Sequence, residues 1–458
     1  MAAARSTPAF TTTLDSYIAR DEAAYKWEKI SQKKIGKNDV TTLLVTSQTW
    51  QGIEWKHRVE IATPEKIEFP GWALLYLSTT NGVFESILTQ SLASKMGAVT
   101  IHVTGIPNQP LFGKREDALI AHTFFEFMRT GDKTWPLLLP MTKSATKVMD
   151  AVQEYSLRQE KPLEKFVVMG ASKRGWAAWL VAAADTKKRV AGIVPLVYDN
   201  LNSEKQLAHQ LESWGEYSAL IADYTRDGFQ EKMRTARGQE LSKIIDPYHY
   251  RSRLMMPKLI INATNDEIWT LDSLNLYWKD LPGPKNVYYA PNVGHTMEGD
   301  LENVFGTATA WFRLVAGGRE LPKVELSSPL GIQNIIGASP KARVFIIDVK
   351  SKDKIKSGRL WIAHSATADF RKAQWKPSKD WTKIMPEVRK RLKMPESKKP
   401  EIPLSSFATA FEPQANYQAY FIEYVFGEGF NTLRLSSPLV IWDTSKDKIS
   451  QSHTSSLK

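Results

Sequence analysis

Three residues, each close to the end of a hydrophobic segment, have the types and the chain order of a nucleophilic hydrolase site. Ser172 lies in KFVVMGASKRGWAAWL, Asp266 near the end of PKLIINATNDE, and His295 at the end of KNVYYAPNVGH. A serine hydroxyl is a weak nucleophile at neutral pH and needs a base within hydrogen-bond reach, which a carboxylate then orients. The sequence therefore predicts a Ser-His-Asp triad that forms an acyl-enzyme.

The segment around Ser172 has the pattern of a strand, a sharp turn and a helix. Residues 165–169 are apolar after Lys165 and include two valines, Gly170 and Gly175 bracket the serine, and a small-aromatic run follows. Such an elbow exposes the hydroxyl above the sheet and points the helix N-terminus at developing negative charge. Arg174 stands where this turn normally has a small residue, so we expect strain that Gly175 must relieve.

The base and the acid are chosen by position along the chain. Of the eight histidines, His295 alone follows both a strand and a glycine downstream of the serine. Asp266 is the preferred acid because it comes directly after a strand, as in a Ser…Asp…His order. Two alternatives stay open, namely the adjacent Glu267 and Asp199 at the end of the preceding strand, in VYDN.

An oxyanion hole requires two backbone donors. The first is the N–H of Lys173, directly after the nucleophile, and the second should come from the loop after strand 71–80. Thr80 and Asn81 are the candidates in that loop.

Substrate-binding candidates are Arg174, Tyr198 and Trp214. The cations of Lys173 and Arg174 have two interpretations. They attract an anionic substrate, or they pair with acidic residues of the segment 201–252. Further aromatic residues of that segment, Tyr217, Tyr248 and Tyr250, are candidates to shape a pocket.

The elements that position these residues alternate between strand and helix from 71 to 316, which predicts an α/β fold with a mostly parallel sheet and helices on both faces. With the chain order of the triad, this predicts an α/β-hydrolase domain over 1–318. Residues 201–252 interrupt the rhythm with a helical pattern and are expected to form a cap. Residues 1–35 are expected to be a helical lead-in.

After residue 319 the pattern changes to short alternating strands separated by turn signals. This predicts an immunoglobulin-like β-sandwich over 319–445, followed by a flexible tail over 446–458.

Composition excludes several classes of protein. The 458 residues include no cysteine, which excludes disulfides, thiol catalysis and thiolate metal sites. No apolar run reaches the roughly 18 residues of a membrane span, and no signal peptide is visible at the N-terminus. No metal cluster, phosphate loop or dinucleotide motif is present, so we expect no metal and no cofactor.

Positive charge is concentrated in one place. The net charge is +12, and residues 371–399 hold 11 lysines and arginines against three acidic residues. We interpret this stretch as a solvated loop, with contact to an anionic surface as the alternative. No nucleic-acid partner is expected, because no regular aromatic residues are interleaved there.

Several motifs together resemble the PhoPQ-activated pathogenicity-related proteins, a family that also includes autocrine proliferation repressor proteins. They are GASKRGWAAWL, PLVYDNLN, ATNDE, YYAPNVGH, the lead-in LDSYIARDEAAYKW and the later DFRKAQW. The resemblance implies an α/β-hydrolase with an added β-domain, the triad Ser172, Asp266 and His295, an exported, periplasmic or secreted location, and a virulence-associated role.

Two functions follow as hypotheses. The first is a serine hydrolase that cleaves an ester or amide (peptide) bond of a small-molecule or peptide substrate. The second is a catalytically inactive hydrolase scaffold that binds or signals, which Arg174 in the elbow favours.

Overall fold

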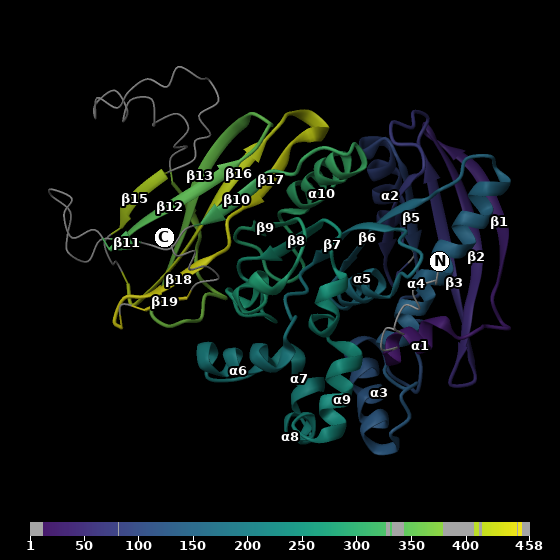
Figure 1. Ribbon diagram of the computed structural model, residues 1–458, viewed down its shortest axis with the longest axis horizontal. Coiled ribbons are helices and arrows are strands. Elements are labelled where there is room, and N and C mark those ends of the chain that lie inside the picture. Colours follow the sequence, from purple (N-terminus) through teal and green to yellow (C-terminus); the bar gives the residue numbers. More distant parts are fainter. Residues whose placement is uncertain are drawn as a thin grey trace, which may run out of the picture.

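The computed structural model of the protein describes residues 12–80, 82–326, 330–331, 343–378, 407–411, 415–446 and 448–450 (Figure 1). Asn81 and the part 379–399 of the basic stretch lie outside these ranges. Within the described ranges, no helix combines the length and the apolar content that crossing a membrane requires.

A large sheet forms the centre of the molecule, and its strands lie in the order β1-β2-β3-β5-β4-β6-β7-β8-β9. The strands from β5 to β9 pair in parallel, whereas β1, β2 and β3 are antiparallel, as is the pair β3 and β5. The predicted mostly parallel sheet is therefore confirmed. The bounds are β1 (Lys26–Ile35), β2 (Asn38–Trp50), β3 (Ile53–Thr63), β4 (Trp72–Leu77), β5 (Val99–Val103), β6 (Lys165–Ala171), β7 (Val190–Leu196), β8 (Lys258–Ala263) and β9 (Lys285–Ala290).

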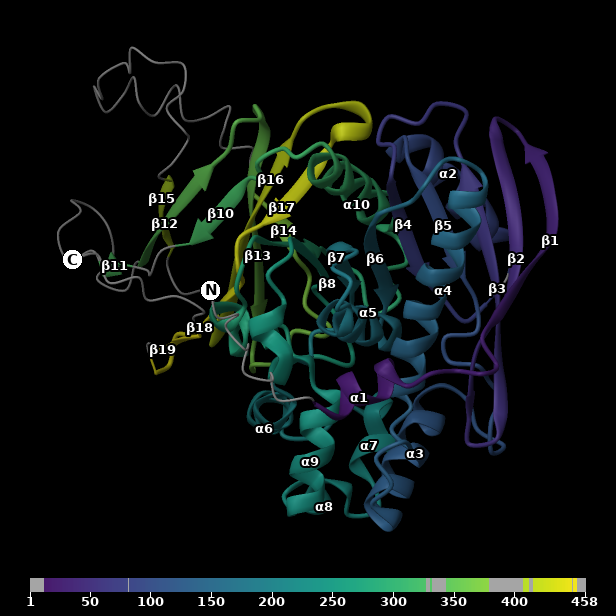
Figure 2. The same cartoon turned by 45° about the vertical axis from the view of Figure 1, so that its right-hand side comes forward.

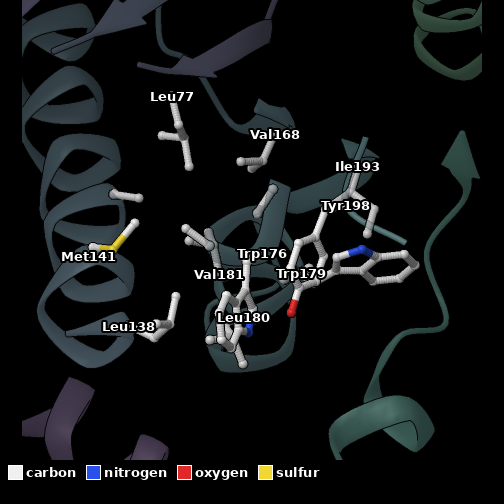
Figure 3. Packing of buried hydrophobic residues seen from close by; sticks show 14 of the residues in the cluster. Leu77, Leu138, Met141, Val168, Trp176, Trp179, Leu180, Val181, Ile193 and Tyr198 are labelled. Atoms are coloured by element: carbon white, nitrogen blue, oxygen red, sulfur yellow. The ribbon is translucent and has the colours of Figure 1, made fainter. Parts of the chain in front are cut away.

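Helices cover both faces of this sheet, α4 (Leu138–Arg158) and α5 (Lys173–Ala184) on one, α2 (Val83–Met96) and α10 (Leu301–Ala316) on the other (Figures 1 and 2). Both faces need cover because neighbouring side chains of a strand point to opposite faces of the sheet. Strand β6 is an example. Val168 belongs to the buried cluster that includes α4 and α5, whereas Val167 belongs to the one that includes α2 and α10. In Figure 3, Val168 faces the side chains of α5 and α4.

The N-terminal expectation is correct only in part. Residues Thr13–Ala19 form the helix α1, with Leu14 and Tyr17 buried. Residues Lys26–Ile35, expected to be helical, instead form β1 against β2 at the sheet edge. This strand is mostly exposed and lacks an apolar face, so its pairing with β2, rather than any pattern of its own, holds it in place.

A group of helices lies together below the parallel strands in Figures 1 and 2. It combines the segment expected to form a cap with one earlier helix. Its members are α3 (Glu116–Thr130), α6 (Ser203–Trp214), α7 (Ala222–Thr225), α8 (Phe229–Met233) and α9 (Ala236–Ile245), with the 3-10 turns η1 (Ala219–Ile221) and η2 (Pro247–Arg253).

Strands also follow residue 319, as expected, but in two sheets. One consists of β10 (Lys323–Leu326), β11 (Leu330–Gly331), β12 (Arg343–Lys350) and β15 (Phe407–Phe411). The other consists of β13 (Ile355–Ser365), β14 (Lys376–Pro377), β16 (Tyr417–Phe426), β17 (Leu433–Ser436), β18 (Val440–Asp443) and β19 (Lys448–Ser450).

The second of these sheets continues the central sheet, because β17 pairs with β9 at Ser436 and Val287. A separate immunoglobulin-like sandwich is therefore not confirmed. Within the segment 446–458, Lys448–Ser450 form β19 and pair with β18.

Candidate active site

Ser172 stands on a strained turn between β6 and α5. Its φ of 53° and ψ of −124° are rare for a residue with a side chain, and such strain persists only where the surroundings hold it. The Ser172 N–H donates to the Leu196 carbonyl at 2.8 Å, and the Ser172 carbonyl accepts from the Trp176 N–H at 3.0 Å. The predicted strand–turn–helix elbow is present.

Arg174 fits into this turn because of Gly170. A Cβ atom on residue 170 would lie 2.5 Å from the Arg174 carbonyl oxygen and 2.8 Å from its Cβ. Gly170 therefore makes room for Arg174, and relief by Gly175 stays a prediction. Gly175 lets the helix approach β7 and the residues after it, since a Cβ there would meet Tyr198 Cβ at 3.0 Å and the Leu196 carbonyl oxygen at 3.3 Å.

The structure brings Ser172, His295 and Asp266 together. His295 Nε2 lies 3.0 Å from Ser172 Oγ. His295 Nδ1 lies 2.9 Å from Asp266 Oδ2 and 3.0 Å from Oδ1. Asp266 is buried, and its Oδ1 also accepts the backbone N–H of Ile268 at 2.7 Å. The carboxylate is therefore fixed independently of the histidine that it contacts.

The two alternative acids lie elsewhere. Glu267 accepts the backbone N–H of His295 at 2.8 Å and does not contact the imidazole. Asp199 accepts from Tyr277 Oη at 2.5 Å and from Asn262 Nδ2 at 2.7 Å. Burial raises the pKa of Asp199 to about 8, despite the hydrogen bond from Tyr277.

The candidates for the oxyanion hole occupy two elements. Lys173 is the first residue of α5, where backbone N–H groups have no acceptor within the helix. Thr80 follows β4, and its hydroxyl donates to Glu85 Oε1 at 2.5 Å. Asn81 lies outside the described residues.

The cations beside Ser172 are paired with acidic residues at the start of α3, whereas the second of the two interpretations placed the pairing acids in 201–252. Lys173 Nζ lies 2.9 Å from Glu116 Oε2 and 2.8 Å from Asp117 Oδ2. Arg174 binds both oxygens of Glu116, at 2.7 and 2.8 Å, and its Nε donates to the Ile106 carbonyl at 2.7 Å. Three of the five N–H donors of the Arg174 guanidinium are thus used within the protein.

These ion pairs change the pKa of the Glu116 carboxyl group. Burial raises its pKa, but Arg174 and Lys173 outweigh that effect and lower the pKa of Glu116 to about 2. The two acids were not singled out from the sequence. The available signal was the adjacent Glu116 and Asp117 at the start of one predicted helix, complementary to Lys173 and Arg174 at the start of another.

A cavity of about 90 Å³ opens at Ser172, and Tyr198 lines it as expected, whereas Trp214 does not. Trp214 instead lies under the Arg371 guanidinium, 4.2 Å from it. The other expected aromatics, Tyr217, Tyr248 and Tyr250, are also absent from the lining. The aromatic residues that line the cavity are Phe124, Trp176, Tyr198, Tyr224, Phe229 and Trp269.

A segment of the C-terminal part contacts the loops that carry the acid and the base. Asn292 forms two hydrogen bonds with the backbone of Trp375, donating to its carbonyl at 3.0 Å and accepting from its N–H at 2.7 Å. Asn265, next to Asp266, donates to the Ala373 carbonyl at 2.8 Å. Residues 370–375 therefore brace both loops.

The basic stretch begins in this same segment. Arg371 pairs with Asp369 at 2.7 Å and covers Trp214, so its charge is used within the protein. The part of the stretch from 379 lies outside the described residues. Within the described ranges, no three His, Asp or Glu side chains group as metal ligands would.

Comparison with solved structures finds esterases. Acetyl xylan esterase 1 from Thermoanaerobacterium sp. JW/SL YS485 has a TM-score of 0.46 at 16% identity and covers 66% of this chain and 91% of its own. An S-formylglutathione hydrolase from Agrobacterium tumefaciens has a TM-score of 0.42 at 13% identity and covers 63% of this chain and 99% of its own.

Comparison of sequences identifies a family. Autocrine proliferation repressor protein A from Dictyostelium discoideum is 31% identical over 365 residues, which are 74% of this chain and 73% of that protein. Residues 14–371 match the sequence model of the PhoPQ-activated pathogenicity-related protein family. The resemblance read from the motifs around Ser172, Asp266 and His295 is confirmed, and the chain belongs to this family.

Proposed function

We propose that this protein is a serine hydrolase of the α/β-hydrolase type, which cleaves an ester or amide bond through an acyl-enzyme. The observation that carries the proposal is the continuous chain of hydrogen bonds from Ser172 through His295 to Asp266, with 3.0 Å at the serine and 2.9 Å at the acid. The strained elbow that presents the serine supports the same role.

In this mechanism Ser172 Oγ attacks the carbonyl carbon of the substrate, and His295 Nε2 takes the hydroxyl proton. The bond to the leaving alcohol or amine then breaks, and His295 returns the proton to that group. Water attacks the acyl-enzyme with His295 again as base, which releases the acid and restores the serine hydroxyl. Asp266 holds the imidazole and stabilises its positive charge throughout.

The tetrahedral intermediate carries an oxyanion, which in this proposal accepts a hydrogen bond from the Lys173 N–H at the start of α5. The loop of Thr80 and Asn81 supplies the second donor in this proposal. Removal of one such donor typically lowers kcat by about 10²–10³-fold.

The proposed division of the chain assigns residues 1–318 to the hydrolase unit, 201–252 to a cap, 319–445 to a β-rich unit and 446–458 to a tail. Support for the cap comes from the cavity at Ser172, whose lining includes Leu207 of α6, Tyr224 of α7 and Phe229 of α8.

The test is covalent labelling of the full chain with diisopropyl fluorophosphate, which reacts with activated serines. Labelling should be lost in Ser172→Ala and in His295→Ala. A matched control is Ser242→Ala, because Ser242 Oγ also lies near a histidine, 3.2 Å from His249 Nε2, but at an exposed site. Labelling that persists in Ser172→Ala, or is lost in Ser242→Ala, contradicts the assignment.

A second candidate is a binding or signalling protein on a hydrolase scaffold. The name of the relative at 31% identity, an autocrine proliferation repressor, favours it. A folded wild-type protein that diisopropyl fluorophosphate does not label, and that hydrolyses no ester, would favour this function over the first.

A further inference from the structure

We infer that the acyl part of the substrate is a short, uncharged aliphatic chain of about two to four carbons, held in the cavity at Ser172. The inference rests on the proposed function and deepens it by naming the substrate class. Four properties of the cavity support it: its walls, its charge, its size and its position relative to His295.

A large part of the wall is aromatic, although Asn200, Ser203, Gln230 and Asp246 also line the cavity. Trp176 and Tyr198 stack at 5.2 Å with an angle of 18° between their planes, and Tyr198 meets Trp269 edge-on at 5.9 Å. The polar atoms of the two tryptophans are satisfied elsewhere, since Trp176 donates to the Ile245 carbonyl at 2.6 Å and Trp269 to the Val197 carbonyl at 3.1 Å. The ring faces that remain favour hydrocarbon over polar groups.

The charged residues that line the cavity are Lys173, Asp117 and Asp246, and the cation among them is already paired. Lys173 is paired with Asp117 at 2.8 Å and with Glu116 at 2.9 Å, and Glu116 also binds Arg174. Asp117 in turn accepts the Tyr224 hydroxyl at 2.8 Å. No cation is left to pair with a substrate carboxylate, and an unpaired carboxylate among aromatic rings is strongly disfavoured. The cavity therefore selects an uncharged group.

The volume of the cavity limits the size of the acyl group. An apolar cavity of about 150 Å³ accommodates benzene. The cavity at Ser172 measures about 90 Å³, which is smaller and therefore suits a short chain better than an aromatic ring.

The position of His295 decides which part of the substrate enters. His295 protonates the leaving group, yet it does not line the cavity, and its side chain is 17% exposed. The leaving group thus departs on the open side, past His295. The acyl group, which stays attached to Ser172 through both steps, occupies the cavity.

The test is a series of p-nitrophenyl esters with the full chain, because the leaving group then stays constant. We expect kcat/KM to be highest for acetate to butyrate and at least about 100-fold lower for octanoate and benzoate. The hemisuccinate ester, equal to butyrate in chain length but anionic, should also be at least about 100-fold lower. Equal or faster turnover of octanoate, benzoate or hemisuccinate would overturn the inference.

Two leucines one turn apart on α6 provide matched variants. Leu207 lines the cavity, whereas Leu211 does not and is 41% exposed. Leu207→Ala should raise the ratio of hexanoate to acetate turnover by about tenfold, and Leu207→Phe should lower butyrate relative to acetate by about tenfold. Leu211→Ala should leave both ratios unchanged. Ratios that move equally in the Leu207 and Leu211 variants would overturn the placement of the acyl chain.

Labelling and the ester series test the hydrolase activity and the substrate class separately. Labelling of Ser172 together with a preference for long, aromatic or anionic acyl groups would leave the hydrolase proposal standing and reject the substrate class. No labelling and no turnover of any ester would reject both.

Discussion

Gly294 lies directly against the carboxylate of Glu267, so that a Cβ atom at position 294 would fall 2.5 Å from Glu267 Oε1. The other oxygen of this carboxylate accepts the backbone N–H of His295 at 2.8 Å. The absence of a side chain at 294 therefore lets Glu267 hold the backbone of the histidine that contacts Ser172.

Gly294→Ala should displace Glu267 and shift His295 away from Ser172. A misplacement of about 1 Å costs about 10²-fold in rate, so we expect kcat/KM for p-nitrophenyl acetate to fall by about that factor. Gly306→Ala is the control, because a Cβ at this site in α10 meets nothing within 4 Å. It should keep full activity, and the prediction fails if the two variants behave alike.

Asp266→Asn and Asp199→Asn distinguish the acid that orients His295 from the alternative. Asp266→Asn should lower kcat by about 10⁴-fold, because an amide favours the wrong tautomer of the imidazole. Asp199 contacts Tyr277 and Asn262, and its pKa of about 8 leaves it largely protonated at pH 7. Asparagine resembles a protonated aspartate, so this variant should stay close to wild type. The reverse order of activities in steady-state kinetics would assign the role to Asp199.

Acid stability should depend on Glu116. Its pKa is lowered to about 2 in the folded protein from 4.5, so its ion pairs contribute stability above pH 4.5 that is lost as the pH falls towards 2. Glu116→Gln removes this contribution. We therefore expect the free energy of unfolding in urea to change less between pH 6 and pH 3 in the variant than in wild type.

A matched variant separates that effect from the loss of any surface carboxylate. Glu240 pairs with Lys133 at 2.6 Å, but this lysine is 54% exposed, whereas Lys173 and Arg174, which pair with Glu116, are 10% and 12% exposed. Exposed pairs of this kind contribute little, so Glu240→Gln should keep the pH dependence of wild type. An unchanged pH dependence in Glu116→Gln would contradict the prediction.

Asn292→Gly should loosen residues 370–375 from the loop that carries His295. Glycine tolerates the φ of 59° at this position but removes both hydrogen bonds to Trp375. We expect a loss of about 1–3 kcal/mol in the free energy of unfolding, together with a lower kcat at similar KM.

Lys188→Gly is the control for this variant, because Lys188 has a similar φ of 55° and an exposed side chain. It should retain both stability and kcat. A wild-type kcat in Asn292→Gly would show that the C-terminal segment does not support the catalytic loops.

The sequence by itself determined those features of the fold and of the site that depend on local pattern and chain order. The apolar runs before Ser172, Asp266 and His295 predict parallel strands, and the carboxyl ends of parallel strands meet at one edge of a sheet. Three residues that follow three such strands are therefore neighbours, whatever the details of the loops. The choice of Asp266 for contact with His295 rested on the same order.

Only the tertiary structure decided the features that depend on contacts between distant segments. The pairing of Arg174 with Glu116 joins residues 58 positions apart, and the contact of Asn292 with Trp375 joins residues 83 positions apart. Likewise, Trp214 faces Arg371 rather than Ser172, and Lys26–Ile35 is a strand because β2 lies beside it. Local propensity cannot specify such partners, since the side chain or strand that satisfies each group is chosen by packing of the whole chain.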